Sequence, residues 1–397
     1  MEVLVRPGDS FWYYSQVFSM PLPLIEDSNP DIDPLRLIAG TPVQIPGYIT
    51  ETYIVQPNDS FWSIANRYQS TVEQVQLLNP NILPNQLQIG QTITVPIRVS
   101  QFVVDDPGQY TYEKMQQDLN QLLTIYPFLR REQIGQSVLG KDIDEIQIGR
   151  GQKTVHVNGS FHANEWITTP VLMRFINEYA LSLTNGRPVR GLFLLPFYQT
   201  VNLSVVPMVN PDGVNLVIQG ADAAGDRKEE VLAINSQQAD FSQWKANIRG
   251  VDLNNQYPAL WEVEAERKPT SPAPRDFPGT SPLTEPEAIA MADLAKTRNF
   301  ARMSALHTQG KVIYWGFQNL EPPEAEQLAN EFSRVSGFTP IRFIDSYAGY
   351  KDWFIQEFRR PGFTIELGLG TNPLPVEQFP EMYEETLGIL LANLYMP

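Results

Sequence analysis

The first hundred residues contain an internal repeat with a fixed spacing of 50 residues. Asp9-Ser10-Phe11-Trp12 recurs as Asp59-Ser60-Phe61-Trp62. Three further pairs share this offset: Asn29-Pro30 with Asn79-Pro80, Gly40 with Gly90, and Ile45-Pro46 with Val95-Pro96. Several coincident pairs at one offset indicate a duplication. The chain is therefore expected to begin with two copies of one small domain, over residues 1–47 and 50–98.

Each copy is expected to fold as a β-α-α-β unit. A short strand leads to Asp-Ser, which is a favourable N-cap for a helix that starts at Phe-Trp. A second helix should end near Asn-Pro, and a closing strand near Ile-Pro or Val-Pro. The first copy departs from this pattern because Pro21 and Pro23 stand where its helix should end. The aromatic residues at the helix starts are expected to be core residues, since aromatics there are usually buried: Phe11, Trp12, Phe61 and Trp62.

These two units resemble LysM domains in the strand opening, the Asp-Ser cap and the Asn-Pro turn. The second copy is nearer to the LysM pattern. The resemblance implies that the units bind glycans containing N-acetylglucosamine, so that the strands of peptidoglycan are the expected partner. The glycan groove is expected to be built from loops.

Residues 105–397 are expected to form one α/β domain after a linker at 96–106. Helical and strand-like stretches alternate over about 300 residues, which is typical of a mixed sheet packed with helices. Helices are expected at 110–126, 166–183, 281–298, 322–336 and 376–395. Strands are expected at 143–148, from 154, and at 192–195, 201–206, 303–307 and 363–367.

Charge and cysteine content exclude several classes of function. The chain has 45 acidic and 29 basic residues, a net charge of −16. This balance argues against binding to nucleic acid, which requires clustered positive charge, and against adhesion to an anionic membrane surface. Because there is no cysteine, a metal site must be built from histidine and carboxylate.

His162 and Glu165 lie three residues apart, immediately after an expected strand. Val155 and Val157 alternate with polar residues, and Gly159 then breaks the run. Open α/β sheets bind ligands at the outgoing ends of their strands. An imidazole and a carboxylate at this spacing can reach one Zn²⁺ from the same side. The pair alone is a weak signal, since so short a motif also arises by chance.

A catalytic zinc site needs three protein ligands and an open position for water. The chain has two further histidines that could supply the third ligand. His307 ends an apolar run, which is typical of a strand that finishes in a polar group. His156 lies inside its strand, and we interpret it as a buried histidine satisfied by its neighbours.

Glu366 is the candidate general base. It lies in an expected strand between Ile365 and Leu367, where an unpaired carboxylate would be costly. Burial there would raise its pKa toward neutrality, as a base requires. The alternative is a glutamate that faces solvent, as most glutamates do.

The segment from Arg249 to Asn255 supplies further polar groups. Arg249 is suited to stabilise a tetrahedral oxyanion. Asp252 is suited to accept the free ring N–H of a ligating histidine and so to fix its tautomer. Asn254 and Asn255 offer amide donors for a substrate carboxylate. On the residues alone, a polar loop remains the simpler interpretation.

The ordered motifs of residues 105–397 resemble those of the zinc metallocarboxypeptidase family. They are His162-x-x-Glu165, Asn210-Pro-Asp-Gly213, Gly250-Val-Asp-Leu-Asn254, His307, Asp352-Trp353 and Thr364-Ile-Glu366. The bacterial γ-D-glutamyl-L-meso-diaminopimelate peptidase branch, often found with paired LysM domains, is the most similar. The resemblance implies a zinc carboxypeptidase-like fold, with a mixed sheet of the eight-stranded type and helices on both faces.

The resemblance also implies roles for individual residues. It implies one Zn²⁺ per catalytic domain, held by His162, Glu165 and His307. Glu366 would act as the base, and Arg249 resembles the arginine that stabilises the oxyanion. A tyrosine that closes over the substrate is expected before Asp352-Trp353, with Tyr347 as the first choice and Tyr350 as the second.

One departure from the family pattern bears on the substrate. Ordinary carboxypeptidases have Asn-Arg where this chain has Asn254-Asn255. The arginine forms a bidentate clamp on the terminal carboxylate of the substrate, so its loss argues against conventional trimming of C-terminal residues. Lys351 could meet a substrate carboxylate, but a solvated lysine is the simpler interpretation.

The expected function is therefore hydrolysis of the γ-D-glutamyl bond to meso-diaminopimelate in peptidoglycan stem peptides. A general carboxypeptidase and a catalytically silent wall-binding protein are the alternatives. The N-terminus lacks the basic and apolar regions of an export signal. This favours the cytoplasm, whereas a wall substrate favours the wall or the spore compartment, and the resemblance points to sporulating cells.

Overall fold

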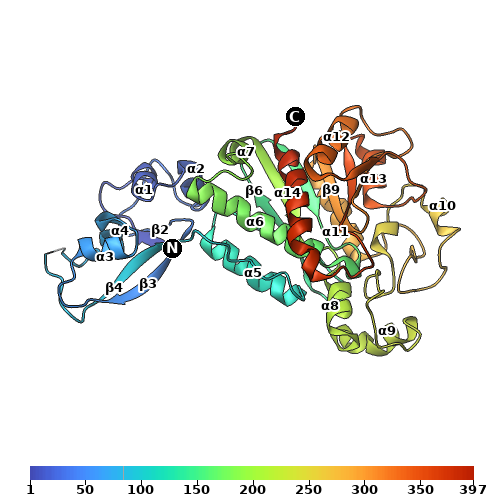
Figure 1. Ribbon diagram of the computed structural model, residues 1–397, viewed down its shortest axis with the longest axis horizontal. Helices are drawn as coiled ribbons and strands as arrows, with labels where there is room; N and C mark the ends of the chain where they lie inside the picture. The colour runs from blue at the N-terminus through green and yellow to red at the C-terminus, as the bar shows by residue number, and fades with distance from the viewer. Residues whose placement is uncertain (84) are drawn as a thin grey trace. The chain divides into compact units, whose positions relative to one another are not determined.

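The computed structural model describes residues 1–83 and 85–397, which divide into two compact units (Figure 1). Unit 1 comprises Met1–Val104, Asp118–Arg130 and Ile176–Leu195, and unit 2 comprises Asp105–Gln117, Arg131–Phe175 and Pro196–Pro397. Two stretches of the predicted domain 105–397 thus group with unit 1. Among the described residues, no helix is both long enough and apolar enough to cross a membrane.

Unit 1 contains two β-α-α-β arrangements in the predicted order. The first consists of β1 (Glu2–Leu4), α1 (Phe11–Val17), α2 (Leu22–Asp27) and β2 (Pro42–Gln44), and the second of β3 (Tyr48–Ile54), α3 (Phe61–Arg67), α4 (Val72–Leu78) and β4 (Thr92–Arg98). Each strand pair is antiparallel. Ser10 and Ser60 cap the first helix of their unit by accepting the N–H of Tyr13 and Ser63. Pro21 and Pro23 stand at the start of α2, where proline is tolerated because the first helical N–H groups have no partner.

The repeated asparagines brace each unit from within. The Asn79 side chain donates to the carbonyls of Val75 and Thr94, both at 2.7 Å, and accepts the Thr94 N–H at 2.9 Å. Asn29 makes the equivalent three bonds to Ile25 and Gln44, at 2.7–2.9 Å. One side chain therefore joins the second helix to the closing strand, which explains why asparagine recurs at this position.

The expectation that all four aromatic residues at the helix starts are buried is half wrong. Phe11 and Phe61 are each 2% exposed, whereas Trp12 is 64% and Trp62 is 69% exposed. Consecutive residues of a helix point about 100° apart, so neighbours in one turn cannot both face a small core. The phenylalanines take the inward position, and the tryptophans lie on the surface.

Among the described residues, an eight-stranded sheet in the order β11-β10-β12-β9-β7-β8-β6-β5 runs through unit 2. The strands are β5 (Arg130–Gln136), β6 (Asp142–Ile148), β7 (Lys153–Asn158), β8 (Val201–Val206), β9 (Arg302–Thr308), β10 (Val312–Tyr314), β11 (Thr339–Ile341) and β12 (Gly362–Leu367). β7 is parallel to β8 and β9, and β9 is parallel to β12. β10 runs antiparallel to β12, and β6 runs antiparallel to β8. The predicted mixed sheet is confirmed.

Ten α-helices follow the N-terminal repeats in the described part of the chain. They are α5 (Tyr112–Ile125), α6 (Thr168–Asn185), α7 (Leu195–Thr200), α8 (Pro211–Gln219), α9 (Lys228–Ile234), α10 (Trp261–Ala265), α11 (Pro286–Arg298), α12 (Glu324–Ser336), α13 (Tyr350–Phe358) and α14 (Phe379–Tyr395). The expected strand at 192–195 is wrong, because α7 begins at Leu195 with Pro196 in its first turn.

Alternation along β9 shows that helices cover both faces of the sheet. Met303 and Ala305 pack in a buried cluster with residues of α11 and α13. Ser304 points to the opposite face, where its Oγ accepts from Asn393 of α14 at 3.2 Å. The sheet is therefore enclosed on both sides, and its strand ends are left as the place where a site can form.

The first prediction concerns the asparagine brace. We expect Asn79→Ala to destabilise its unit by ~2 kcal/mol, because buried backbone groups of Val75 and Thr94 lose their partner. Hydrogen exchange of the full chain measures this as about 30-fold faster exchange in β4. Asn81→Ala, at an exposed position two residues on, is the matched control. Equal protection of β4 in both variants would contradict the assignment.

Candidate metal centre

Three neighbouring parallel strands bring predicted site residues to one edge of the sheet. β7 leads to His162, which precedes the short 3-10 helix Ala163–Glu165. His307 lies near the end of β9 and Glu366 near the end of β12. The register pairs Glu366 directly with His307, so both side chains project to the same face. Because the carboxyl ends of parallel strands meet at one edge, residues far apart in sequence converge there.

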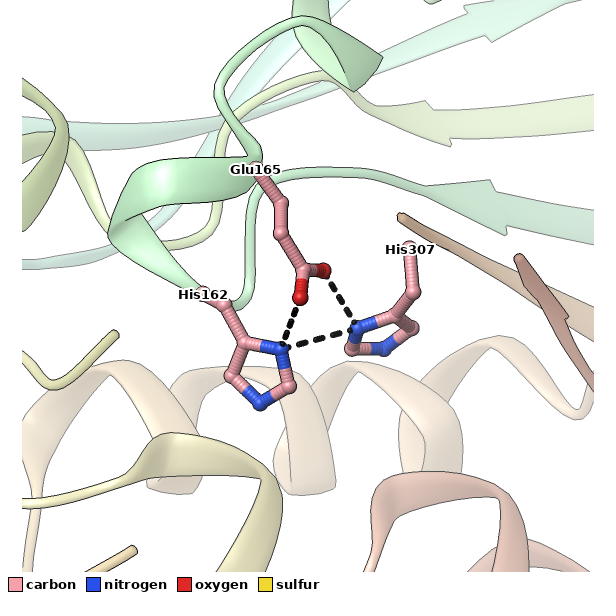
Figure 2. A group of neighbouring side chains, drawn as sticks. All are labelled: His162, Glu165 and His307. Carbon is pink, nitrogen blue, oxygen red and sulfur yellow. Dashed lines mark hydrogen bonds and ion pairs between the residues drawn. The ribbon is translucent and has the colours of Figure 1, made fainter. Parts of the chain in front are cut away.

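Figure 2 shows the side chains of His162, Glu165 and His307 directed at one another. The Nδ1 atoms of the two histidines lie 3.2 Å apart. Glu165 places Oε1 2.8 Å from His162 Nδ1 and Oε2 2.9 Å from His307 Nδ1. All three residues are buried, and their candidate ligand atoms lie within 4.8 Å of one another. Two imidazoles and one carboxylate form a donor set used by catalytic zinc sites.

The tautomer of His162 supports a cation at this position. Its Nε2 lies 3.3 Å from Oδ1 of Asp252, which is buried. If Asp252 accepts the Nε2 proton, Nδ1 of His162 is left with a free lone pair that faces Nδ1 of His307 and the Glu165 carboxylate. Electron pairs directed at a common point repel one another unless a positive charge lies between them. The residues therefore fit a divalent cation such as zinc.

Negative charge dominates the surroundings of the cluster. Burial alone would lower the pKa of His162, but Glu165 and Asp252 raise it to about 9. Burial alone would raise the pKa of Glu165 and of Asp252, but the charge of His162 lowers both. The cluster thus attracts positive charge, and a metal must compete with protons for the same atoms.

Glu366 is half-buried beside the cluster. Burial, followed by the charge of Glu165, raises the pKa of Glu366 to about 8. It lines a cavity together with His162 and does not face bulk solvent on the outside of the sheet. The alternative of an ordinary exposed glutamate is therefore excluded.

Two cavities meet at the cluster. Cavity A has a volume of about 170 Å³ and cavity B of about 260 Å³. Both are lined by His162, Lys245, Tyr314 and Glu366. Cavity B also includes Glu165 and Arg275, and cavity A extends toward the start of α13. A substrate that passes from one cavity to the other has a bond beside the cluster.

Three further predicted residues line cavity A: Asn254, Asn255 and Tyr347. Asn254 also accepts the N–H of Tyr350 through its Oδ1, at 3.0 Å, which ties its segment to the first turn of α13. Tyr350, the second choice for the tyrosine that closes over the substrate, is fully buried in the core and cannot take that role.

Arg249 does not lie where its predicted role requires. It lines neither cavity, and its Nη1 faces Oε2 of Glu285 at 3.5 Å. Asn247 accepts the N–H groups of Arg249 and Val251 at 3.0–3.1 Å and forms a tight turn with Gly250 at φ +71°. This turn directs Arg249 away from the cluster.

The same turn is supported by buried acids. The Nδ2 of Asn247 donates to Glu285 at 2.7 Å and to Glu287 at 3.3 Å. All three side chains are buried. The amide of Asn247 therefore connects the turn at residues 247–251 to the start of α11.

Lys245 is a charged group at the cluster that the sequence interpretation missed. It lines both cavities, and its Nζ lies 3.8 Å from Asp252 and 3.9 Å from Asp276. Burial alone would lower the pKa of Lys245, but Asp252, Glu165 and Asp276 raise it. The available signal was a lysine flanked by two apolar residues, Trp244 and Ala246.

Lys351 is not solvated, contrary to the expectation. It is 5% exposed and lines cavity A. Its Nζ donates to the carbonyl of Gly316 at 2.8 Å and lies 2.6 Å from Oδ1 of Asp352. The carboxylate of the next residue explains how the charge is tolerated in the interior.

His156 is a satisfied core histidine, as interpreted from its position within a strand. Its Nδ1 lies 2.9 Å from Oγ of Ser204, and its Nε2 lies 3.1 Å from Nδ2 of Asn158. Burial lowers the pKa of His156 to about 3, so the ring is neutral. It is not part of the cluster.

Comparison with known families supports the two predicted kinds of domain. Residues 115–388 match the zinc carboxypeptidase family. Residues 53–96 match the LysM domain family. This is one LysM domain and not the two that were predicted, since the match does not extend to residues 1–47. The repeat at residues 1–47 has the same β-α-α-β order as the repeat at residues 50–98. Its sequence differs by Pro21 and Pro23.

Individual relatives and structures agree with this assignment. The chain is 60% identical over 396 residues to gamma-D-glutamyl-L-diamino acid endopeptidase 1 of Lysinibacillus sphaericus, covering 100% of both chains. Bovine thrombin-activatable fibrinolysis inhibitor has a TM-score of 0.54 at 17% identity, covering 74% of this chain and 97% of its own. Carboxypeptidase A from Helicoverpa armigera has a TM-score of 0.54 at 16% identity, covering 88% and 98%. At these identities the two structures show the fold alone.

The second prediction concerns Asp252. We expect Asp252→Asn to weaken zinc affinity by about 10- to 100-fold, because a neutral amide holds the Nε2 proton of His162 less firmly. Competition with a chromogenic chelator measures this affinity. Asp240→Asn, an exposed aspartate outside both cavities, is the control. Unchanged affinity in the Asp252 variant would contradict its role.

Proposed function

This chain belongs to the zinc carboxypeptidase family and is a zinc metallopeptidase, and we propose that it hydrolyses the γ-D-glutamyl bond to meso-diaminopimelate in peptidoglycan stem peptides. The observation that carries the proposal is the cluster of His162, Glu165 and His307 beside Glu366, at the junction of two cavities. The similarity to the Lysinibacillus sphaericus endopeptidase over the full length of both chains supports the class of substrate.

In this proposal one zinc is held by His162, Glu165 and His307. Zinc bound there supplies a Lewis acid for the substrate carbonyl and lowers the pKa of the attacking water. Asp252 keeps His162 in the tautomer whose Nδ1 is free, and Thr308 donates its N–H to Oε2 of Glu165 at 3.2 Å. These contacts fix the orientation of the ligands.

Glu366 is the residue that transfers a proton during hydrolysis. Its carboxylate takes a proton from the attacking water and returns it to the nitrogen of the leaving diamino acid. It lines both cavities and so stands beside a bond that crosses from one to the other. Burial raises the pKa of Glu366, which suits a carboxyl group that both accepts and releases a proton near neutral pH.

Lys245 stabilises the oxyanion in place of Arg249. It stands beside the cluster in both cavities, whereas Arg249 lines neither. Asp252 and Asp276 form ion pairs with the ammonium group at 3.8–3.9 Å. A fixed positive charge beside the cluster stabilises the negative charge that develops on the carbonyl oxygen.

The neutral amides in cavity A are suited to an enzyme that cleaves a bond inside a peptide and not only the bond to its C-terminal residue. An arginine fork favours a free terminal carboxylate, whereas the amides of Asn254 and Asn255 bind a carboxylate or a peptide carbonyl without that charge preference. The leaving diamino acid can therefore be linked onward. We propose that Tyr347, which lines the same cavity, closes over it.

The N-terminal units hold the enzyme on its polymer. We propose that residues 50–98, and residues 1–47 with the same fold, bind glycan strands ahead of a catalytic domain at 105–397. Attachment to the polymer raises the local concentration of stem peptide at the site.

The third prediction tests the cleavage. Digestion of purified muropeptides should release fragments cut between D-glutamate and diaminopimelate, as mass spectrometry identifies. Glu366→Gln should lower kcat by about 10²- to 10⁴-fold with zinc content unchanged, because the proton carrier is lost. Glu377→Gln, at an exposed position, is the control. Release of ordinary C-terminal residues only would rule out the bond proposed, and absence of zinc would rule out the mechanism.

The fourth prediction separates Lys245 from Arg249. Lys245→Ala should lower kcat by about 10²- to 10³-fold, as removal of an oxyanion donor does. Lys245→Arg should recover part of that loss because it keeps a positive charge. Arg249→Ala should leave kcat nearly unchanged. The assignment is wrong if steady-state kinetics show the larger loss in the Arg249 variant.

A further inference from the structure

Cavity A contains a buried cation that the proposed chemistry does not use. Lys351 is the second residue of α13 and lines cavity A together with Asn255 and Glu366. It does not line cavity B, so it lies in the part of cavity A that is not shared at the cluster. Its ion pair with Asp352 explains how a lysine is tolerated in the interior. The pair does not explain why a cation stands in the wall of a substrate cavity.

The ammonium group of Lys351 has donor capacity to spare. It carries three N–H groups, of which one is directed to the carbonyl of Gly316 at 2.8 Å. Oδ1 of Asp352 lies 2.6 Å from the same nitrogen, so these two partners engage at most two of the three N–H groups. A carboxylate that enters cavity A would therefore meet a positive charge that is already removed from water, where charge-assisted hydrogen bonds are strong.

The other two lysines of cavity A are held by more than one carboxylate. Lys245 lies between Asp252 and Asp276 at 3.8–3.9 Å and belongs to the reacting site. Lys268 lies 3.5 Å from both Glu264 and Asp276. Lys351 is thus the lysine of cavity A with the fewest carboxylate partners and the least exposure.

We propose that Lys351 binds the distal carboxylate of the diaminopimelate side chain and thereby selects this diamino acid over lysine. The inference rests on the proposed function, since it takes cavity A to hold the leaving diamino acid. The side chain of diaminopimelate ends in a carbon that carries both an amine and a carboxylate, whereas that of lysine ends in an amine alone. A cation in the cavity wall attracts the carboxylate at the end of the diaminopimelate side chain and repels the lone amine at the end of the lysine side chain.

The position of Lys351 favours the distal carboxylate over the α-carboxylate. The α-carbon of the leaving residue is bonded to the nitrogen of the cleaved bond, so its carboxyl group lies beside the cluster. The distal carboxylate is removed from it by a chain of methylene groups. Asn254 and Asn255 are the neutral donors for the nearer group, and Lys351 is the charged donor for the farther one.

The test compares γ-D-glutamyl substrates that differ only in the diamino acid. They contain meso-diaminopimelate, its distal monoamide, its α-monoamide or L-lysine. For the wild-type full-length enzyme we expect kcat/KM to be about 10- to 100-fold lower for the distal amide and for lysine than for diaminopimelate, the cost of one buried charge-assisted hydrogen bond. The α-amide should be cleaved nearly as well as diaminopimelate.

Variants then assign the discrimination to a residue. Lys351→Met should lower kcat/KM for diaminopimelate and its α-amide, which both carry the free distal carboxylate, to the level of the distal amide, and should leave the values for the distal amide and for lysine little changed. A merely structural role would lower all four values together. Because Lys351→Met leaves Asp352 buried and unpaired, the double variant Lys351→Met with Asp352→Asn removes both charges and keeps the test valid if the single variant does not fold. Lys268→Met, which removes a cation of cavity A that is not part of the reacting site, should preserve the discrimination.

Each possible result either supports or overturns the assignment of Lys351 to the distal carboxylate. Equal cleavage of diaminopimelate and its distal amide by the wild type overturns the inference and leaves the proposed function standing. Loss of discrimination in the Lys268 variant, or sensitivity to the α-amide in place of the distal amide, also overturns it. Failure to cleave any γ-D-glutamyl substrate refutes the proposed function, and the inference falls with it.

Discussion

The parallel, in-register pairing of β7, β9 and β12 is the constraint on which the site depends. It sets Glu366 beside His307 on one face of the sheet and brings His162 to the same edge. A shift of the register by one residue would turn either side chain to the opposite face, against α14 instead of the cavities. The helices on both faces are needed because they bury the strands and so fix this register.

The balance of buried charge follows from that arrangement. Three carboxyl groups lie together where the strands end: Glu165, Asp252 and Glu366. The positive charge that the protein places beside them is that of Lys245. The turn at Asn247 directs Arg249 toward Glu285, whereas Lys245, two residues before Asn247, lines both cavities. The backbone of the loop thus selects between two cations four residues apart in sequence.

Sequence patterns predicted those features of the structure that depend on interactions between residues close together in the chain. The duplicated β-α-α-β order, the mixed sheet and the burial of His156 all follow from periodicity, caps and strand position. Convergence of the three candidate ligands required the family resemblance, because spacing along the chain does not give the order of strands in a sheet.

The failures have a common physical origin. Trp12 and Trp62 are exposed because helix geometry, and not residue type, decides which of two neighbouring aromatics faces the core. Arg249 and Lys351 were misplaced because a turn and an adjacent carboxylate govern where a long basic side chain lies. Such contacts are formed in three dimensions, and no pattern along the chain records them.

The buried acid next to Asn247 couples folding to the uptake of one proton. Burial, with a contribution from Asp212, raises the pKa of Glu287 from 4.5 to about 7. The folded chain therefore keeps a proton that the unfolded chain releases near pH 4.5. The stabilisation, ~3 kcal/mol in order of magnitude, is complete below that pH and is lost as the pH rises through about 7. Alkaline conditions thus weaken the support of the turn that separates Lys245 from Arg249.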